Sequence, residues 1–281
     1  MKNKNIKNQI WLSIGVTTIF IILILSGIFL IKADSKKVIL TSIYNTSDIL
    51  KNKNYENKVE IEIKTKENQT SKISYKSLKS NDKYKLNIKQ YSNNKLLNSS
   101  INYIEKDIDH YNFYYKLDNN WNKISINDLN SKLKFNIDYT KLVKNIKSYN
   151  YVGKVKVNNK KLYKYSVKLK EYEAYNFLYS SSIMSKNNSN KSTKLYLYID
   201  KKNGIIYALE YQLKNIKDKN QKYQYNVLIE NNDIDNTLKI NIPDIKKECY
   251  NYKNIKNECG EINEVEKFIY MYTSFVYCIW M

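Results

Sequence analysis

Residues 194–213 read KLYLYIDKKNGIIYALEYQL, and this stretch decides the class of fold. On each side of a polar segment, every second residue is large and apolar, which is the pattern of a strand with one buried and one wet face. The intervening DKKNG, residues 200–204, combines residue types that favour a tight turn. The stretch therefore predicts an antiparallel hairpin with Leu195, Leu197 and Ile199 on its buried face.

The same two-residue period recurs on both sides of this hairpin. It is clearest at four further sets of alternating positions: Val59, Ile61, Ile63; Tyr84, Leu86, Ile88; Tyr111, Phe113, Tyr115, Leu117; and Tyr223, Tyr225, Val227, Ile229. Residues 35–51, 139–149 and 172–184 instead carry apolar residues at helical spacing. We therefore expect an α+β domain over residues 35–243, in which a curved antiparallel half-barrel sheet holds helices on its concave face.

Residues 10–31, IWLSIGVTTIFIILILSGIFLI, contain no charge. As a helix at about 1.5 Å per residue they span roughly 33 Å, the thickness of a hydrocarbon core. Leu25-Ser26-Gly27 resembles the start of a lipobox, but Ile28 occupies the position of the lipidated Cys. We expect an uncleaved, single-pass transmembrane signal anchor in the cell membrane, with residues 1–9 in the cytoplasm and the main domain outside.

Lys alone carries the positive charge of this chain. The 281 residues include 48 basic side chains, all Lys, against 27 acidic ones, which gives a net charge of +21. An AT-rich genome produces this usage of Lys, Asn, Ile and Tyr without selection, and attraction to anionic lipid or a wall polymer is the functional alternative. Nucleic acid is disfavoured as a partner, because Arg is absent and the Lys are dispersed.

The sequence contains no constellation typical of an enzyme. His110 is the single His, and no Cys lies near it at metal-ligand spacing. No Gly-rich phosphate loop and no nucleophile elbow occur. Two carboxylate pairs, Glu60 with Glu62 and Glu171 with Glu173, lie among Lys and are typical of a solvated charged face. We therefore expect neither catalysis nor a metal or cofactor.

The three Cys lie near the end of the chain. Cys249 and Cys259 are ten residues apart in a polar segment, so outside the cytoplasm a disulfide and a pair of free thiols are both open alternatives. We expect residues 244–281 to form a polar linker followed by an apolar tail. The tail, FIYMYTSFVYCIWM at residues 268–281, is compatible with an extra strand, an interfacial segment or an out-of-frame extension.

The order of these elements resembles the LolA/LppX-like lipoprotein-carrier fold of exported bacterial domains. The resemblance rests on the opening helix followed by strands, on Asn119-Asn120-Trp121 before the helical middle, on the hairpin at residues 198–206 and on an expected final strand, residues 238–242, that ends at Pro243. It implies an apolar cavity between half-barrel and helices, which in some members carries lipid. This chain departs from the family by lacking a lipidated Cys and by continuing past the last strand. An uncleaved anchor prevents shuttling, so the implied role is binding or sensing at the membrane surface.

We therefore expect a membrane-anchored, extracytoplasmic and non-enzymatic domain that binds an apolar or amphiphilic ligand, or an envelope component such as a wall polymer. The candidate ligand-cavity residues are Leu86, Phe113, Tyr115, Trp121 and Leu197. The alternative is a structural or regulatory partner of an envelope protein complex that docks through a sheet edge. A deep cavity lined by the candidate residues would favour the first function, and a filled core with an exposed apolar patch the second.

Overall fold

The computed structural model describes residues 34–65, 69–108, 110–117, 119–126, 138–178, 191–218, 221–234, 238–244 and 247–249. The transmembrane segment expected at residues 10–31 and the apolar tail lie outside these ranges. Within them, no helix combines the length and the apolar character needed to cross a bilayer.

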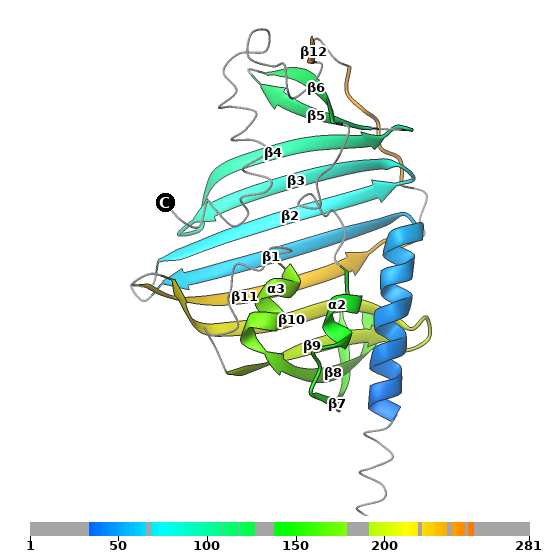
Figure 1. The fold of residues 1–281 in the computed structure, drawn as a ribbon, viewed down its shortest axis with the longest axis vertical. Helices are drawn as coiled ribbons and strands as arrows, with labels where there is room; N and C mark the ends of the chain where they lie inside the picture. Colours follow the sequence, from blue (N-terminus) through cyan, green and yellow to red (C-terminus); the bar gives the residue numbers. More distant parts are fainter. Residues whose placement is uncertain are drawn as a thin grey trace, which may run out of the picture.

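The described strands form a single open sheet (Figure 1). Its order is β12-β6-β5-β4-β3-β2-β1-β11-β10-β9-β8-β7, and all neighbours are antiparallel except β12 and β6. The strands are β1 (Tyr55–Thr65), β2 (Thr70–Ser80), β3 (Lys83–Ser92), β4 (Lys95–Lys106), β5 (Tyr111–Leu117), β6 (Asn120–Ile126), β7 (Ser148–Val157), β8 (Lys160–Lys170), β9 (Ser192–Asp200), β10 (Ile205–Asp218), β11 (Gln221–Asn232) and β12 (Lys247–Cys249). A helix over residues 34–52, α2 (Thr140–Val143) and α3 (Glu171–Leu178) complete the fold.

The predicted hairpin at residues 194–213 is confirmed as β9 and β10. Leu197 pairs with Leu209 and both side chains are buried, as the two-residue period requires. Gly204 ends the turn with φ of +63°, a left-handed conformation that Gly adopts without steric cost. Local sequence therefore suffices to build this part of the sheet.

The pairing of β1 with β11 joins the two ends of the sheet-forming chain. Ile61 lies opposite Val227, and Val59 lies opposite Ile229. This contact closes the N-terminal meander, β1 to β6, onto the strands β7 to β11. The result is one curved sheet rather than two separate ones (Figure 1).

The helices cover one face of β1 and β7–β11, here called the inner face (Figure 1). Ile39 and Ile43 from the first helix, Leu142 from α2 and Phe177 from α3 pack into one core with the strands. This core includes Leu197 and is built of fully or nearly fully buried side chains. The half of the sheet made by β7–β11 is therefore filled.

Two expected elements differ in the structure. We expected a helix over residues 139–149, but only Thr140–Val143 is helical and Ser148 begins β7. Pairing of Tyr149 with Val167 of β8 places this segment in the sheet and overrides its helical spacing. Residues 238–242, expected as a final strand, have no ladder in the described part, where the Ser80 hydroxyl donates to the Leu238 carbonyl.

Candidate functional site

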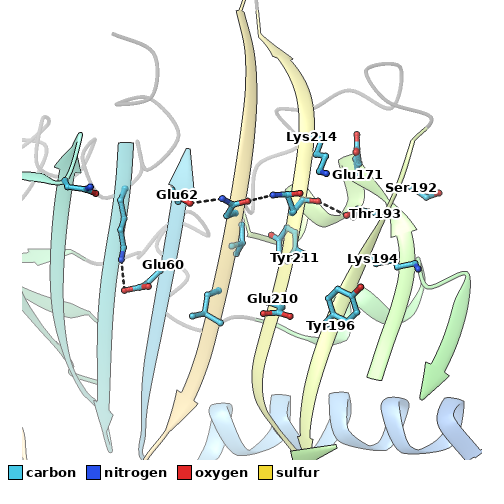
Figure 2. A pocket seen from close by; sticks show the side chains of 16 residues that line it. Glu60, Glu62, Glu171, Ser192, Thr193, Lys194, Tyr196, Glu210, Tyr211 and Lys214 are labelled. Carbon is cyan, nitrogen blue, oxygen red and sulfur yellow. Dashed lines mark hydrogen bonds and ion pairs between the residues drawn. The ribbon is translucent and has the colours of Figure 1, made fainter. Parts of the chain in front are cut away.

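A pocket of about 830 Å³ opens on the outer face of the sheet, opposite the helices (Figure 2). We call it the outer pocket. Outward-pointing side chains of β1, β9, β10 and β11 line it, among them Glu60, Glu62, Tyr196, Glu210, Gln212 and Asn226. These positions alternate with buried apolar residues along each strand, so the two-residue period that builds the core also builds the pocket.

Glu62, Asn226 and Gln212 form a row across three neighbouring strands (Figure 2). Asn226 Nδ2 donates to Glu62 Oε2 at 2.7 Å, and Gln212 Nε2 donates to Asn226 Oδ1 at 2.6 Å. Each group orients the next, because an amide donates from its nitrogen and accepts at its oxygen. The pocket thus has a preorganised polar surface that runs across the strands.

Glu60 lies beside this row and bridges two ammonium groups. Its Oε1 is 3.2 Å from both Lys58 Nζ and Lys72 Nζ. Burial raises the pKa of the Glu60 carboxyl, but hydrogen bonds from the two Lys outweigh burial and leave its pKa below the usual value. Glu60 is therefore an ionised acceptor at neutral pH.

Lys164 holds the aromatic wall of the outer pocket in place. Its Nζ lies 3.0 Å from Glu210 Oε1 and 2.8 Å from the Tyr198 hydroxyl, and 4.2 Å from the Tyr196 ring centroid. Burial lowers the pKa of Lys164, but hydrogen bonds with Tyr198 and Glu210 outweigh burial and raise it overall. The Tyr196 ring is thus fixed by a cation on one side.

Lys194 and Lys214 reach the outer pocket from β9 and β10 (Figure 2). Both are exposed, and neither forms an ion pair with a carboxylate among the described residues. The pocket therefore offers acceptors on its floor and exposed ammonium donors at its rim. Over the described ranges, no cluster of three or more His, Cys, Asp or Glu side chains has metal-binding geometry.

The residues expected to line an apolar cavity do not gather around one space. Leu86, Phe113 and Tyr115 are buried on the inner face of β3 and β5. Leu197 shares this face but belongs to the filled core. The register places Trp121 on the outer face, where its ring meets Tyr103 edge-on with centroids 5.3 Å apart.

The inner face of β3 and β4 also carries a buried amide. Asn102 lies opposite Leu86 and is 0% exposed. Within the described part of the chain, neither its Nδ2 nor its Oδ1 has a hydrogen-bond partner. Burying an unpaired amide is costly, so this position stands out beside the apolar side chains of Ile104 and Phe113.

The two features expected of a docking partner, a filled core and exposed apolar side chains, are present in part of the sheet. The half of the sheet around Leu197 is filled, and Leu96 and Leu97 of β4 are exposed.

Cys249 lies in β12 beside β6, whereas Cys259 lies outside the described residues, so the disulfide is untested. His110 Nε2 is 3.5 Å from Asp107 Oδ2, a surface contact.

Sequence reasoning dismissed Glu60 and Glu62 as part of a solvated face. The structure places them in the outer pocket, next to residues more than 140 positions later in the chain. The usable signal was weak: Gln212 and Asn226 are uncharged amides at outward positions of their strands. Glu173, from the other pair, accepts a hydrogen bond from the Lys170 backbone N–H at 3.0 Å and stabilises the start of α3.

Comparison with known proteins yields likenesses in structure only. No family model and no curated protein match the sequence. Among solved structures, LprF from Mycobacterium bovis is similar at 10% identity and a TM-score of 0.42, covering 75% of this chain and 97% of that one. Lipoprotein LppX from Mycobacterium tuberculosis is similar at 9% identity and a TM-score of 0.41, covering 72% and 97%. A LolA superfamily protein from Nitrosomonas europaea gives 9% and 0.24, covering 71% and 91%.

LppX and the LolA superfamily protein bear the names of the class that the sequence resembles, each at 9% identity and with a TM-score below 0.5. At these identities and TM-scores the likeness concerns the fold alone.

Proposed function

We propose that this chain is a membrane-anchored, extracytoplasmic and non-enzymatic binding domain whose outer pocket holds a hydroxyl-rich segment of an envelope component. The observation that carries the proposal is the row Glu62–Asn226–Gln212 on the pocket floor. A hydroxyl group both donates and accepts, so a preorganised row of alternating donors and acceptors suits it. The pocket volume, about 830 Å³, lies within the usual range of ligand sites, about 300–1,000 Å³.

The charges of the outer pocket favour a polar polymer over an apolar ligand. The carboxylates of Glu60 and Glu210 are acceptors held by Lys58, Lys72 and Lys164. The free ammonium groups at the rim provide donors for hydroxyls and for anionic substituents of the polymer. An apolar chain would desolvate these charges without offering them hydrogen bonds, at a cost in binding free energy.

A binding experiment with a matched variant tests this proposal. The full chain in detergent is cosedimented with purified cell-wall sacculi and titrated with chitotetraose. Asn226→Ala removes the centre of the row, and we expect it to weaken binding about tenfold, a loss of about 1.4 kcal/mol. Glu56→Gln is the control, because Glu56 pairs with Lys76 at 2.7 Å on the same face outside the pocket. Absence of binding to either probe, or equal binding by both variants, would contradict the proposal.

A second candidate function is binding of an amphiphile on the inner face of β3–β5. Asn102 favours it, because an unpaired buried amide among apolar side chains suits a ligand with an ester or hydroxyl group on acyl chains. Native mass spectrometry of the full chain, purified from its own membrane, would detect a retained lipid. Asn102→Leu should lose that lipid while keeping binding to sacculi. Loss of both ligands would assign them to one site, and retention of the lipid would contradict a role for Asn102.

Membrane anchoring is the third part of the proposal, and it rests on the uncharged run at residues 10–31. We expect the chain to stay in the membrane after an alkaline wash and its main domain to be cut by external protease. Recovery of a mature N-terminus near Asp34 would contradict an uncleaved anchor.

A further inference from the structure

The N-terminal end of the first helix and the edge strand β7 lie at the same end of the molecule (Figure 1). Lys36, in the first turn of the helix, places its Nζ 6.0 Å from the ring centroid of Tyr149 in β7. The uncharged run at residues 10–31 ends three residues before Asp34. Even fully extended, three residues span only about 10 Å. A bilayer that holds the proposed anchor therefore also lies close to β7.

β7 presents apolar and aromatic groups at this edge. Tyr151 is 40% exposed and Val152 is 50% exposed. The ladder with β8 shifts register between Tyr151 and Gly153, so Val152 bulges out of the pairing. Tyr151 is held in place by ring contacts with Tyr163 and Tyr165, with centroids 6.3 Å and 5.3 Å apart. The exposed groups are thus fixed by the fold.

Lys side chains surround these rings. Lys154 Nζ is 5.6 Å and Lys201 Nζ is 5.3 Å from the Tyr163 ring centroid, on the helix side of β7. Together with Lys36, they form no ion pair with a carboxylate in the described ranges. Asp34, whose charge acts on Tyr165, offsets one of the three. The edge therefore combines Tyr, an aliphatic side chain and excess positive charge.

We infer that this edge, formed by Lys36, Tyr149, Tyr151, Val152, Lys154 and Lys201 and here called the β7 rim, rests on the anionic surface of the lipid bilayer. Tyr and Lys are suited to this interface, because each combines an apolar stem or ring with a polar end that stays in the headgroup region. Anionic headgroups attract Lys within about a Debye length of the surface. The inference rests on the proposed membrane anchor, which brings the β7 rim to the bilayer.

Contact with headgroups also covers an edge of the sheet that is otherwise exposed. β7 pairs only with β8 among the described strands, so one side of its backbone faces outward. An open edge of ten residues is a site for unwanted pairing with other chains. A bilayer surface placed against it excludes such partners and supplies phosphate oxygens and water to its N–H groups.

Hydrogen exchange of the full chain tests the inference. The chain is reconstituted in nanodiscs of phosphatidylcholine alone or of phosphatidylcholine mixed with phosphatidylglycerol, and backbone exchange is followed in peptides covering residues 148–157. We expect exchange there to be slowed about fivefold in the anionic nanodiscs. Peptides covering residues 95–102 of β4, remote from β7 in the sheet order, are the internal control and should not change.

Variants separate docking from anchoring. Tyr151→Asp combined with Val152→Asp should abolish the lipid-dependent protection, whereas Leu96→Asp combined with Leu97→Asp on β4 should leave it intact. Copurification of the chain with the nanodisc reports anchoring independently. A chain that copurifies but shows equal exchange at 148–157 in both lipids overturns the β7 rim alone. A chain that does not copurify overturns the anchor and, with it, the membrane-bound function.

Discussion

Replacing Asn231 by Ala tests whether a buried amide holds the two halves of the sheet together. Asn231 lies on β11 and is 1% exposed. Its Oδ1 accepts from Asn57 Nδ2 of β1 at 2.8 Å. Its Nδ2 donates to the Tyr139 hydroxyl at 2.9 Å and to the Ile206 carbonyl of β10 at 2.8 Å. The side chain therefore joins β1, β10, β11 and the residue before α2.

The expected loss follows from these contacts. Three hydrogen bonds at about 1 kcal/mol each give about 3 kcal/mol, and leaving the fully buried Tyr139 hydroxyl without its partner adds about 1 kcal/mol or more. We predict that Asn231→Ala lowers the free energy of unfolding by about 3–5 kcal/mol. In a domain of this size that corresponds to a fall in Tm of about 10 °C.

Asn226→Ala is the matched control. Asn226 lies on the same strand and also makes three side-chain hydrogen bonds, to Glu62, Gln212 and Gln224, but it is only half-buried. Water replaces its lost partners, so we expect a loss of about 1 kcal/mol or less. The assay is urea unfolding of the full chain in detergent, followed by Tyr and Trp fluorescence, with the m-value required to stay constant. Equal losses for the two variants would refute the reasoning from burial.

Three further predictions concern the first helix, a turn and a carboxylate. Lys79 is buried and donates to backbone carbonyls in the last turn of the helix over residues 34–52. Lys79→Met should therefore lower the free energy of unfolding by about 1–3 kcal/mol. An unchanged urea midpoint would contradict this prediction. Gly204 has φ of +63°, and an added Cβ would lie 2.9 Å from Asn45 Nδ2. Gly204→Ala should therefore lower the free energy of unfolding by about 1–2 kcal/mol, measured by a thermal melt. An unchanged Tm would show that the turn relaxes. Burial raises the pKa of Glu60, but its two Lys partners hold the net pKa below 4.5; its stabilisation is present above that value and is lost as pH falls through the folded-state pKa. The urea midpoint should therefore drop more steeply below about pH 5 for the parent chain than for Glu60→Gln, and parallel profiles would argue against the ion pairs.

The lysines give the whole chain a net positive charge, whereas the row on the floor of the outer pocket binds through hydrogen bonds. The net charge of +21 acts over about 8 Å at physiological ionic strength, so nonspecific attraction to anionic polymers should weaken with salt. Binding through the row Glu62–Asn226–Gln212 depends on hydrogen bonds and should be less sensitive to the salt concentration. Repeating the sacculus titration at high salt separates these two contributions.

The alternation of residue types determined the strands of this protein without help from tertiary structure. Leu195, Leu197 and Ile199 stand opposite their β10 partners because a period of two fixes which side chains share a face, and the DKKNG segment supplies a turn that needs no distant contact. The uncharged run at residues 10–31 is a similarly local signal.

Tertiary structure alone decided which strands meet and what their outer faces enclose. Glu62 is next to Asn226 only because β1 pairs with β11, a contact between segments more than 150 residues apart whose register no local pattern encodes. The same holds for Tyr149, which pairing with β8 draws into an edge strand despite its helical spacing. Local sequence sets the face on which a side chain lies along its own strand, whereas its neighbours across the sheet depend on the burial gained by the whole fold.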